Sequence, residues 1–232
     1  MLSRTGLIEK FLKLINSKHD NQEEINEILP YIFDNFNLIL KRGNNLIQKI
    51  FYKNFTNSLE NEIVFKYIYQ LIQEKISNLN SFKTYIIRLN KLKNKKKLKF
   101  KFLKTNFEQN LDSRILRFLQ LLCENHNPLL QNYLRYQFNF RKSYNLISIT
   151  NQYLQQLYHN IEGRTFSAII KCLDCLVEFI QGPCLENQNV LMNSKLVSTV
   201  SEILDSFTSE KADTNIKFTV EKSIMAYKVY II

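Results

Sequence analysis

Glycine and proline are scarce in this sequence, with four glycines and three prolines among 232 residues. All-β sandwiches need many turn residues and phosphate-binding loops need clustered glycines, so the composition argues against both. The four glycines, Gly6, Gly43, Gly163 and Gly182, are isolated from one another. Apolar residues make up 45% of the chain, enough to bury a substantial core. Since no segment shows sustained two-residue alternation, the sequence predicts an all-α protein.

Histidine is equally rare, and the sequence shows no arrangement of side chains that is typical of catalysis. His19, His126 and His159 are the three histidines. None of them stands with a serine or cysteine and a third partner in the pattern of nucleophilic catalysis, and the carboxylates are scattered singly. We therefore expect no enzyme, no catalytic residue, no cofactor and no small-molecule substrate.

The cysteines allow two interpretations. Cys172 and Cys175, taken with Cys123 and His126, offer four ligands of the zinc type on paper. However, Cys172 and Cys175 lie within apolar helical sequence, where a free cysteine behaves as a small hydrophobic residue. We favour buried thiols and expect no metal site.

Long apolar runs are absent as well. The longest uncharged window, residues 143–161, is rich in asparagine and glutamine, so it cannot cross a bilayer core of about 30 Å as a lipid-facing helix. The first residues lead into an amphipathic pattern with charges inside it, which is not a secretory signal. These features predict a soluble, cytoplasmic chain.

The most informative stretch runs from residue 115 to residue 137. It reads as two apolar helical faces joined by a polar corner, in which Asn127 stands at the N-cap position and Pro128 at the first helical position. The first face is made by Ile115, Phe118, Leu119 and Leu122, and the second by Leu130, Tyr133 and Leu134. The same corner recurs at Asn44 and at Cys184, and a glutamine follows each corner residue by four positions: Gln48, Gln131 and Gln188. We expect each glutamine to hydrogen-bond the backbone of its own corner.

Backbone geometry is also expected to repeat. Gly43 and Gly182 end the preceding helix where a positive φ is useful, and Asn125 with His126 takes that place in the middle copy. The corner residues are 83 and 57 positions apart. These intervals predict a short, irregular, armadillo-like α-solenoid of helical hairpins.

Apolar spacing predicts the remaining helices. We expect them over 7–15, 25–36, 46–56, 62–77, 143–158, 166–181, 188–207 and 216–230. Pro30 would either kink the second helix or open a new one. The helix over 166–181 is apolar around much of its circumference and should be the core helix.

The positive charge is concentrated in one segment. Residues 83–104 hold ten of the 32 basic residues and no acid, which leaves 22 basic and 21 acidic residues elsewhere. A block of like charges is typical of a solvated, mobile insert. Apolar residues interleave with the lysines, so contact with anionic lipid is an alternative, whereas lysine is poor at bidentate base recognition and nucleic acid is disfavoured. The lysines that would make such a contact are Lys93, Lys95, Lys96, Lys97 and Lys99.

Three runs carry a resemblance to a known family. They are residues 117–127, residues 130–135 and residues 181–189. They resemble the homology-associated domain shared by inositol trisphosphate receptors and ryanodine receptors, the intracellular calcium-release channels. The motif and corner residues are Asn44, Gln48, Cys123, Glu124, Asn125, His126, Asn127, Gln131, Gln181, Gly182, Pro183, Cys184, Glu186, Asn187 and Gln188.

The resemblance implies a function that composition does not. It implies a non-enzymatic regulatory module at the cytosolic face of a calcium-store membrane, with other domains or subunits of a tetrameric channel as partners. The inositol phosphate site of that family lies in other domains, so no ligand residue is assigned. The alternative is a free-standing helical scaffold that binds another protein, with anionic membrane contact through its lysine run.

Four segments are expected along the chain. Residues 1–87 would form N-terminal helical hairpins, and residues 88–110 the basic, mobile insert. Residues 111–208 would form the receptor homology-associated domain. Residues 209–232 would form a C-terminal helix that stops within its apolar pattern, as if truncated.

Overall fold

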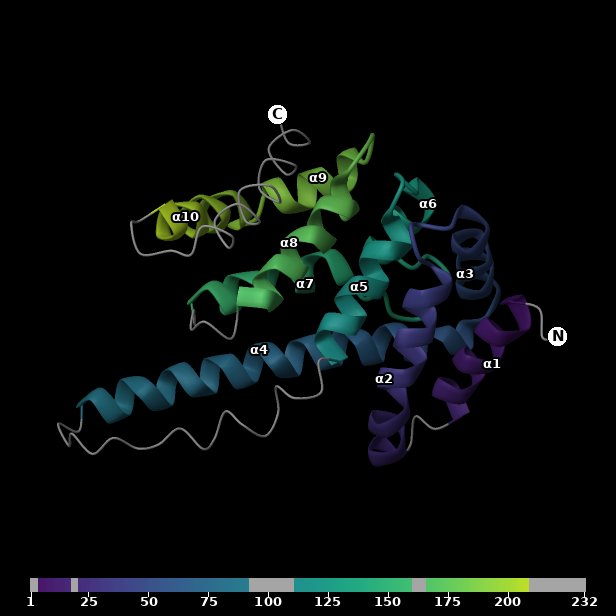
Figure 1. Cartoon of the computed structure of the whole chain (residues 1–232), viewed down its shortest axis with the longest axis horizontal. Coiled ribbons are helices and arrows are strands. Elements are labelled where there is room, and N and C mark those ends of the chain that lie inside the picture. The colour runs from purple at the N-terminus through teal and green to yellow at the C-terminus, as the bar shows by residue number, and fades with distance from the viewer. Residues whose placement is uncertain (1–3, 18–20, 92–110, 160–165, 209–232) are drawn as a thin grey trace.

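A computed structural model of the chain describes residues 4–17, 21–91, 111–159 and 166–208 (Figure 1). Within these ranges the chain forms ten α-helices, one 3-10 helix and no strand, which confirms the all-α prediction. The helices are α1 (Arg4–Ser17), α2 (Gln22–Ile39), α3 (Asn45–Asn57), α4 (Glu62–Lys91), α5 (Leu111–Cys123), α6 (Pro128–Arg135), α7 (Leu146–His159), α8 (Phe166–Ile180), α9 (Leu185–Met192) and α10 (Leu196–Thr208), with the 3-10 helix η1 at Leu59–Asn61.

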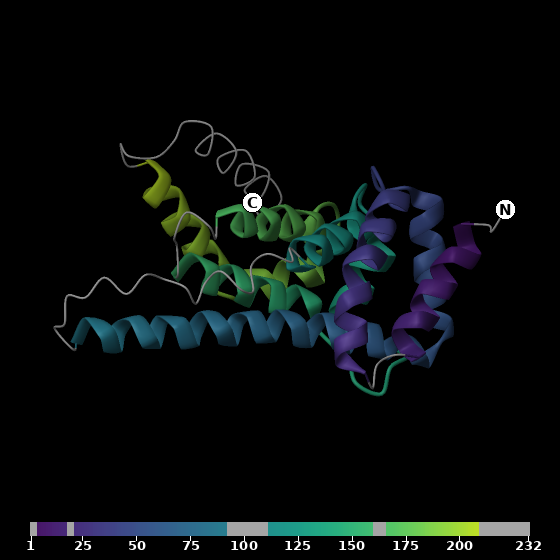
Figure 2. The ribbon, with the colours of Figure 1, turned by 60° about the horizontal axis from the view of Figure 1, so that its bottom comes forward.

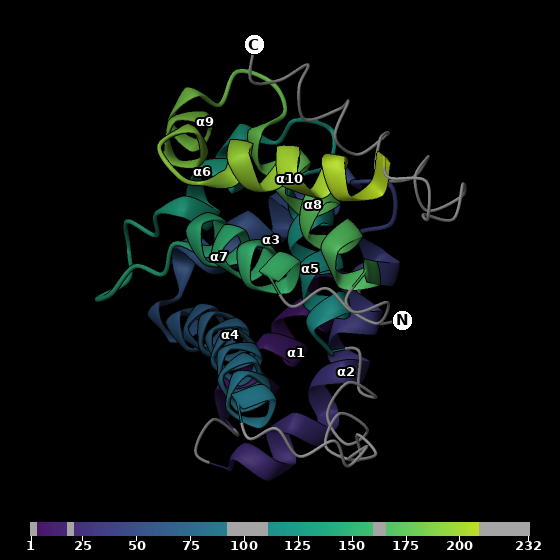
Figure 3. The ribbon, with the colours of Figure 1, turned by 90° about the vertical axis from the view of Figure 1, so that its left-hand side faces the viewer.

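The helices stack as three successive units. Helices α2, α5 and α8 pack side by side in one row, α3, α6 and α9 in a second, and α4, α7 and α10 in a third (Figures 1 and 3). Unit 1 is therefore α2 to α4, unit 2 is α5 to α7, and unit 3 is α8 to α10. The α-solenoid prediction is confirmed, but each unit has three helices and is not a simple hairpin. A third helix is needed because the two helices of a corner leave an apolar face uncovered.

The core follows from the apolar stripes in the sequence. All four apolar positions predicted for one face of α5 are buried. They are Ile115, Phe118, Leu119 and Leu122. Phe118 stacks on Phe36 of α2 with ring centroids 5.3 Å apart, and Phe36 meets Phe51 of α3 edge to face at 5.0 Å. Burial of each such ring stabilises the fold by about 1.5–3 kcal/mol.

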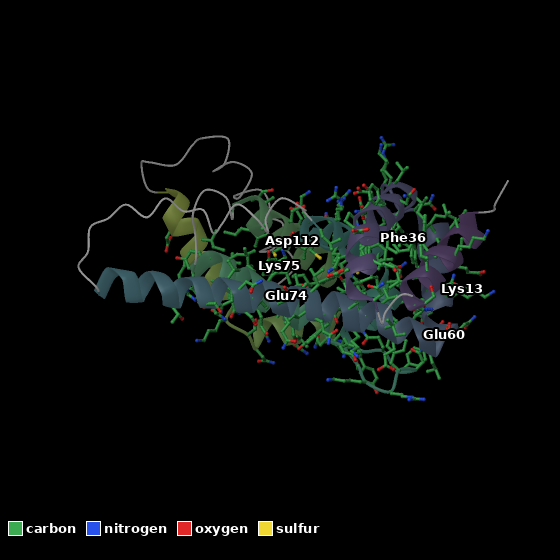
Figure 4. All side chains as sticks on the ribbon, turned by 90° about the horizontal axis from the view of Figure 1, so that it is seen from below. Lys13, Phe36, Glu60, Glu74, Lys75 and Asp112 are labelled. Atoms are coloured by element: carbon green, nitrogen blue, oxygen red, sulfur yellow. The ribbon has the colours of Figure 1, made fainter. Side chains whose placement is uncertain are left out.

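This aromatic cluster joins unit 1 to unit 2. Phe36 lies at the end of the molecule formed by α1, α2 and α3, the end that also carries Lys13 and Glu60 (Figure 4). Helix α1 lies across α2, α3 and α4 there, with Ile8, Leu12 and Ile15 on its buried face. In unit 3, α8 buries most of its apolar residues, as expected for the core helix: Ile169, Cys172, Leu173, Cys175, Leu176, Val177, Phe179 and Ile180.

Two helix boundaries differ from the predictions. Helix α4 was expected to stop near residue 77, but it continues to Lys91 along one side of the molecule (Figure 2). The polar residues after position 77 are weak helix formers, yet buried Leu79 anchors the continued helix to the core, and Thr84 Oγ1 donates to the Asn80 carbonyl. Pro30 lies inside an unbroken α2.

The second difference is the helix predicted over 188–207, which is two helices. Ser194 separates α9 from α10, because its hydroxyl donates to the Leu191 carbonyl at 2.5 Å and accepts from the Leu196 N–H at 3.2 Å. A serine that bonds the backbone locally competes with helix continuation. The helix predicted over 216–230 and most of the basic insert lie outside the described residues.

Among the helices that the structure describes, none has the length and apolarity that a membrane crossing requires.

Candidate functional site

The three corners lie along one edge of the stack, each between the first and second helix of its unit (Figure 1). We define corner 1 as residues 38–48, corner 2 as residues 121–131 and corner 3 as residues 178–188. The equivalent residues at the start of the second helix are Asn44, Asn127 and Cys184.

The first two corners begin their second helix with an asparagine cap, as predicted. Asn44 Oδ1 accepts from the N–H groups of Leu46 and Ile47, and Asn127 Oδ1 accepts from that of Leu130 at 3.2 Å. These contacts satisfy amide groups that a helix start leaves without partners. Cys184 holds the same position in corner 3 but makes no side-chain cap.

Each corner turns through left-handed backbone, which also agrees with the sequence. The φ values are 58° at Gly43, 67° at Asn125, 58° at His126 and 83° at Gly182, and Arg42 joins them at 63°. Space explains the glycine in corner 1: a Cβ there would lie 2.6 Å from Asn125 Nδ2. At Gly182 the nearest atom would be His126 Nδ1 at 3.2 Å, so His126 packs against corner 3.

Gln48 joins corner 1 to corner 2. Its Nε2 donates to the carbonyls of Leu121 at 2.9 Å and Glu124 at 2.8 Å, and its Oε1 accepts from Asn127 Nδ2 at 2.9 Å. The residue is only 1% exposed. Asn125 adds contacts in the opposite direction, because its Nδ2 donates from corner 2 to the carbonyls of Arg42 and Gly43 in corner 1, both at 3.0 Å.

Gln131 repeats the contact one unit later. Its Nε2 donates to the carbonyls of Glu178 and Gln181, both at 2.8 Å, and it is also 1% exposed. In both corners the accepting carbonyls stand six and three positions before the corner residue. Asn187 Nδ2 donates back to the Gln131 carbonyl at 3.0 Å. We call this series of contacts the glutamine ladder.

The expectation that each glutamine bonds its own corner is wrong for Gln48 and Gln131. Each lies one turn into its second helix, on the side that faces the next unit, so the carbonyls within reach belong to the next corner. Gln188 behaves as predicted, donating to the carbonyls of Ile180 at 3.0 Å and Gly182 at 3.2 Å in corner 3.

An ion pair reinforces the second junction, and the sequence analysis missed it. Arg135 at the end of α6 pairs with Glu186 and donates through Nε to Asn187 Oδ1 at 2.9 Å. Glu186 is largely exposed, so the charge pair itself contributes little and the contact to Asn187 matters more. The spacing of Arg135 from Gln131, one turn along the same helix, is the signal that could have identified it.

Tyr133 is a second contact that the sequence did not reveal. Periodicity placed it on an apolar face, and it is buried. Its hydroxyl also bonds the Phe55 carbonyl at 3.0 Å and Asn139 Oδ1 at 2.7 Å, which ties unit 2 to the end of α3. A buried tyrosine needs a partner for its hydroxyl, but the sequence could not say which.

Three cysteines and one glutamate near the corners have shifted pKa values. Cys123, Cys172 and Cys175 are buried, and burial raises the pKa of each thiol well above its ordinary value. The pKa of Glu178 is raised to about 7 by burial and by the nearby carboxylates of Glu124 and Asp174, against an opposing effect of Arg117. Neutral, buried thiols are poor nucleophiles and poor metal ligands. Within the described ranges, no three His, Cys, Asp or Glu side chains are placed to hold a metal ion.

Other predicted residues have simpler positions. Pro183 is exposed at the tip of corner 3, and Gln181 takes part in the ladder through its carbonyl. The lysines proposed for contact with an anionic surface lie outside the described residues. They are Lys93, Lys95, Lys96, Lys97 and Lys99.

The fold and the ladder define a class first: an α-solenoid of three-helix units joined at their corners by buried carboxamides. Comparison with known proteins then shows what part of the chain is similar to. Residues 106–204 match the family model described as RyR and IP3R Homology associated. The chain is also 37% identical over 126 residues to the inositol 1,4,5-trisphosphate receptor itr-1 of Caenorhabditis elegans, an alignment of 50% of this chain.

That alignment covers 4% of the receptor's own length. The family match spans α5 to most of α10, which is units 2 and 3 with both of their corners. Residues 106–204 of the chain are therefore similar to the RyR and IP3R homology-associated domain, in agreement with the resemblance read from the sequence.

Proposed function

We propose that this chain is a non-enzymatic regulatory module of an intracellular calcium-release channel of the inositol trisphosphate or ryanodine receptor type. The observation that carries the proposal is the 37% identity to an inositol trisphosphate receptor over 126 residues. The ladder residues of corners 2 and 3 fall within the family match at 106–204. In this role the chain's partners are other domains or subunits of the channel, at the cytosolic face of the calcium store.

The ladder suits a module that transmits displacement. Gln48 and Gln131 each hold two backbone carbonyls of the next unit in buried surroundings. Breaking such a contact leaves carbonyls without partners and costs about 1–3 kcal/mol for each stranded group. A movement of one unit is therefore passed to the next rather than absorbed between them, and the solenoid connects ligand-binding and pore regions mechanically.

A non-enzymatic role agrees with the side chains at the corners. The hydrogen-bonding groups of Gln48 and Gln131 are engaged with backbone, and the thiols of Cys123, Cys172 and Cys175 are buried with raised pKa values. Groups in this state bind and position helices and do not attack substrates.

A receptor chimaera tests the proposal. The matching segment of the nematode receptor is replaced by residues 106–204 of this chain, and calcium release evoked by inositol trisphosphate is measured in cells without other such receptors. We expect the chimaera to release calcium. We further expect Gln131→Leu to reduce release at equal expression, while Leu129→Ala, at an exposed position of the same helix, does not. A chimaera that assembles normally but never opens would contradict the proposal.

The lysine run supports a second candidate function, a free-standing scaffold that contacts an anionic membrane. Ten basic residues without an acid between positions 83 and 104 would contribute roughly 1 kcal/mol each near such a surface. Co-sedimentation with phosphatidylserine vesicles and with neutral phosphatidylcholine vesicles tests it. Binding to the former that disappears when Lys93, Lys95, Lys96, Lys97 and Lys99 are changed to glutamine would support membrane contact, and equal recovery with both vesicles would exclude it.

A further inference from the structure

Corner 2 shows what a glutamine of the ladder needs in order to bind. Three groups hold the Gln48 carboxamide: the carbonyls of Leu121 and Glu124, which accept from Nε2, and Asn127 Nδ2, which donates to Oε1. Both donor and acceptor sides of the amide are therefore recognised, which neither a carboxylate nor an ammonium group could reproduce.

Corner 1 presents the same three groups. The residues six and three positions before its cap are Leu38 and Lys41, and the cap itself is Asn44. The Leu38 carbonyl receives only backbone N–H groups, from Leu40 and Lys41, and no side chain within the described ranges donates to the Lys41 carbonyl. Asn44 uses Oδ1 to cap α3, and its Nδ2 has no acceptor among the described residues.

The side of corner 1 that carries these groups is open. Leu38 is 68% exposed, whereas its equivalent in corner 2, Leu121, is 1% exposed beneath unit 1. Tyr31 lies two turns before Leu38 on the same face of α2 and is exposed as well. An exposed apolar face beside the Lys41 carbonyl and Asn44 Nδ2 corresponds in position to the face that is buried around Leu121 at the junction of units 1 and 2.

Corner 3 carries the glutamine that a site of this kind would bind. Gln188 is equivalent to Gln48 and Gln131, but it is half-buried and folds back onto its own corner at 3.0 and 3.2 Å. The chain offers no further corner of this kind after it within the described residues. Charge is complementary too: Glu186 beside Gln188 pairs with Arg135 but keeps 68% of its side chain exposed, while Lys41 and Arg42 at corner 1 are exposed and basic.

We propose that corner 1 is a carboxamide-binding site that takes Gln188 from corner 3 of a second copy of this chain. Gln188 Nε2 donates to the Lys41 carbonyl beside Leu38, Asn44 Nδ2 donates to Gln188 Oε1, and Arg42 approaches Glu186. The contact continues the glutamine ladder from one molecule to the next. Since the two surfaces differ, the association is head to tail and does not close as a symmetric dimer does. The inference does not depend on a role in a calcium channel.

Two substitutions test the two surfaces separately. Asn44→Asp keeps the oxygen that caps α3 but replaces the donor that faces Gln188 with an acceptor, and Gln188→Leu removes the incoming amide. In sedimentation velocity at about 100 µM, where micromolar association is visible, we expect the unaltered chain to show a mass that rises above 27.7 kDa with concentration. We expect each variant alone to associate at least about tenfold more weakly.

Sedimentation of a mixture of the two variants is the decisive experiment. Gln188→Leu retains an intact corner 1 and Asn44→Asp retains an intact Gln188, so an equimolar mixture should form a dimer and nothing larger. Asn21→Asp is the matched control, since it makes the same chemical change at the cap of α2, away from corner 1, and should associate as the unaltered chain does. Thermal denaturation of each variant checks that it remains folded.

Three results would overturn the proposal. One is an unaltered chain that stays monomeric at about 100 µM. Another is association that persists in folded Asn44→Asp and Gln188→Leu, which would place the contact elsewhere. The last is a mixture of the two variants that remains monomeric.

Discussion

Corner 2 receives a glutamine from the unit before it and sends one to the unit after it, whereas corner 3 receives Gln131 and keeps its own Gln188. The three glutamines occupy equivalent positions, one turn into the second helix. Their partners differ with their surroundings. Gln48 and Gln131 face a next corner and are buried against it, whereas Gln188 faces none among the described residues and donates to the nearest carbonyls of its own corner.

The largest expected effect breaks the first junction. Gln48→Leu strands the carbonyls of Leu121 and Glu124 and the amide of Asn127, all at a residue that is almost fully buried. We expect a loss of about 2–4 kcal/mol in the free energy of unfolding, measured by urea denaturation. A loss within experimental error would show that water replaces these contacts and that the ladder does not hold units 1 and 2 together.

Gln131 and Gln188 form the closest matched pair. Gln131→Leu strands two carbonyls between units 2 and 3 and should cost about 1–3 kcal/mol. Gln188→Leu removes contacts within one corner at a half-buried position, and we expect it to cost about 0.5–1 kcal/mol. Urea denaturation of both variants under one set of conditions gives the comparison, and equal losses would contradict the distinction between corners 2 and 3.

The two corner glycines should also differ. An alanine at either position must adopt a positive φ, which costs about 1–2 kcal/mol. At Gly43 the added Cβ also meets Asn125 Nδ2 at 2.6 Å and Glu124 Cβ at 2.8 Å, whereas at Gly182 it meets only His126, at 3.2 Å or more. Thermal denaturation should therefore give Gly43→Ala a lower melting temperature than Gly182→Ala. The opposite order would mean that corner 1 can separate from corner 2 at little cost.

The last expected effect concerns pH at the second junction. The pKa of Glu178 is raised from 4.5 to about 7, so the folded state favours its protonated form. Below pH 4.5 Glu178 is protonated in both the folded and the unfolded chain, and the free energy of unfolding is at its full value. As the pH rises through 7 the buried carboxyl group must ionise, and this part of the free energy of unfolding is lost. Glutamine does not ionise, so Glu178→Gln should gain stability over the unaltered chain between those values, by about 1–2 kcal/mol once solvent screening is allowed for.

Denaturation of both proteins at pH 4.5 and at pH 8 measures this gain. Arg117, Glu124 and Asp174 face the carboxylate and are unchanged in the variant, so they serve as an internal control. A stability difference that does not change with pH would show that Glu178 titrates normally.

The sequence predicted what depends on neighbours along the chain. The buried face of α5, the caps at Asn44 and Asn127, and the left-handed backbone at Gly43, Asn125 and His126 all follow from local spacing and local hydrogen bonding. These features are set within one helix or one turn, where a single sequence carries enough information.

What the sequence could not predict depends on how units stack. The acceptors of Gln48 are 73 and 76 residues away, and no pattern in the intervening chain indicates that α2 and α5 are neighbours. The hydroxyl partner of Tyr133 in α3 could not be predicted for the same reason. The prediction ended α4 too early, because packing at Leu79 outweighs the low helix propensity of the residues after position 77.

Hydrogen exchange of the side-chain amides tests the ladder most directly. In nitrogen-15-resolved NMR spectra, the Nε2 protons of Gln48 and Gln131 should exchange slowly with deuterium, because each donates to two carbonyls of the next unit at 2.8–2.9 Å in a buried site. Those of Gln188 should exchange faster, since it is half-buried, and its exchange is recorded in the Asn44→Asp background so that contact between copies does not contribute. Rapid exchange at Gln131, equal to that at Gln188, would contradict the claim that buried glutamines join the units of this solenoid.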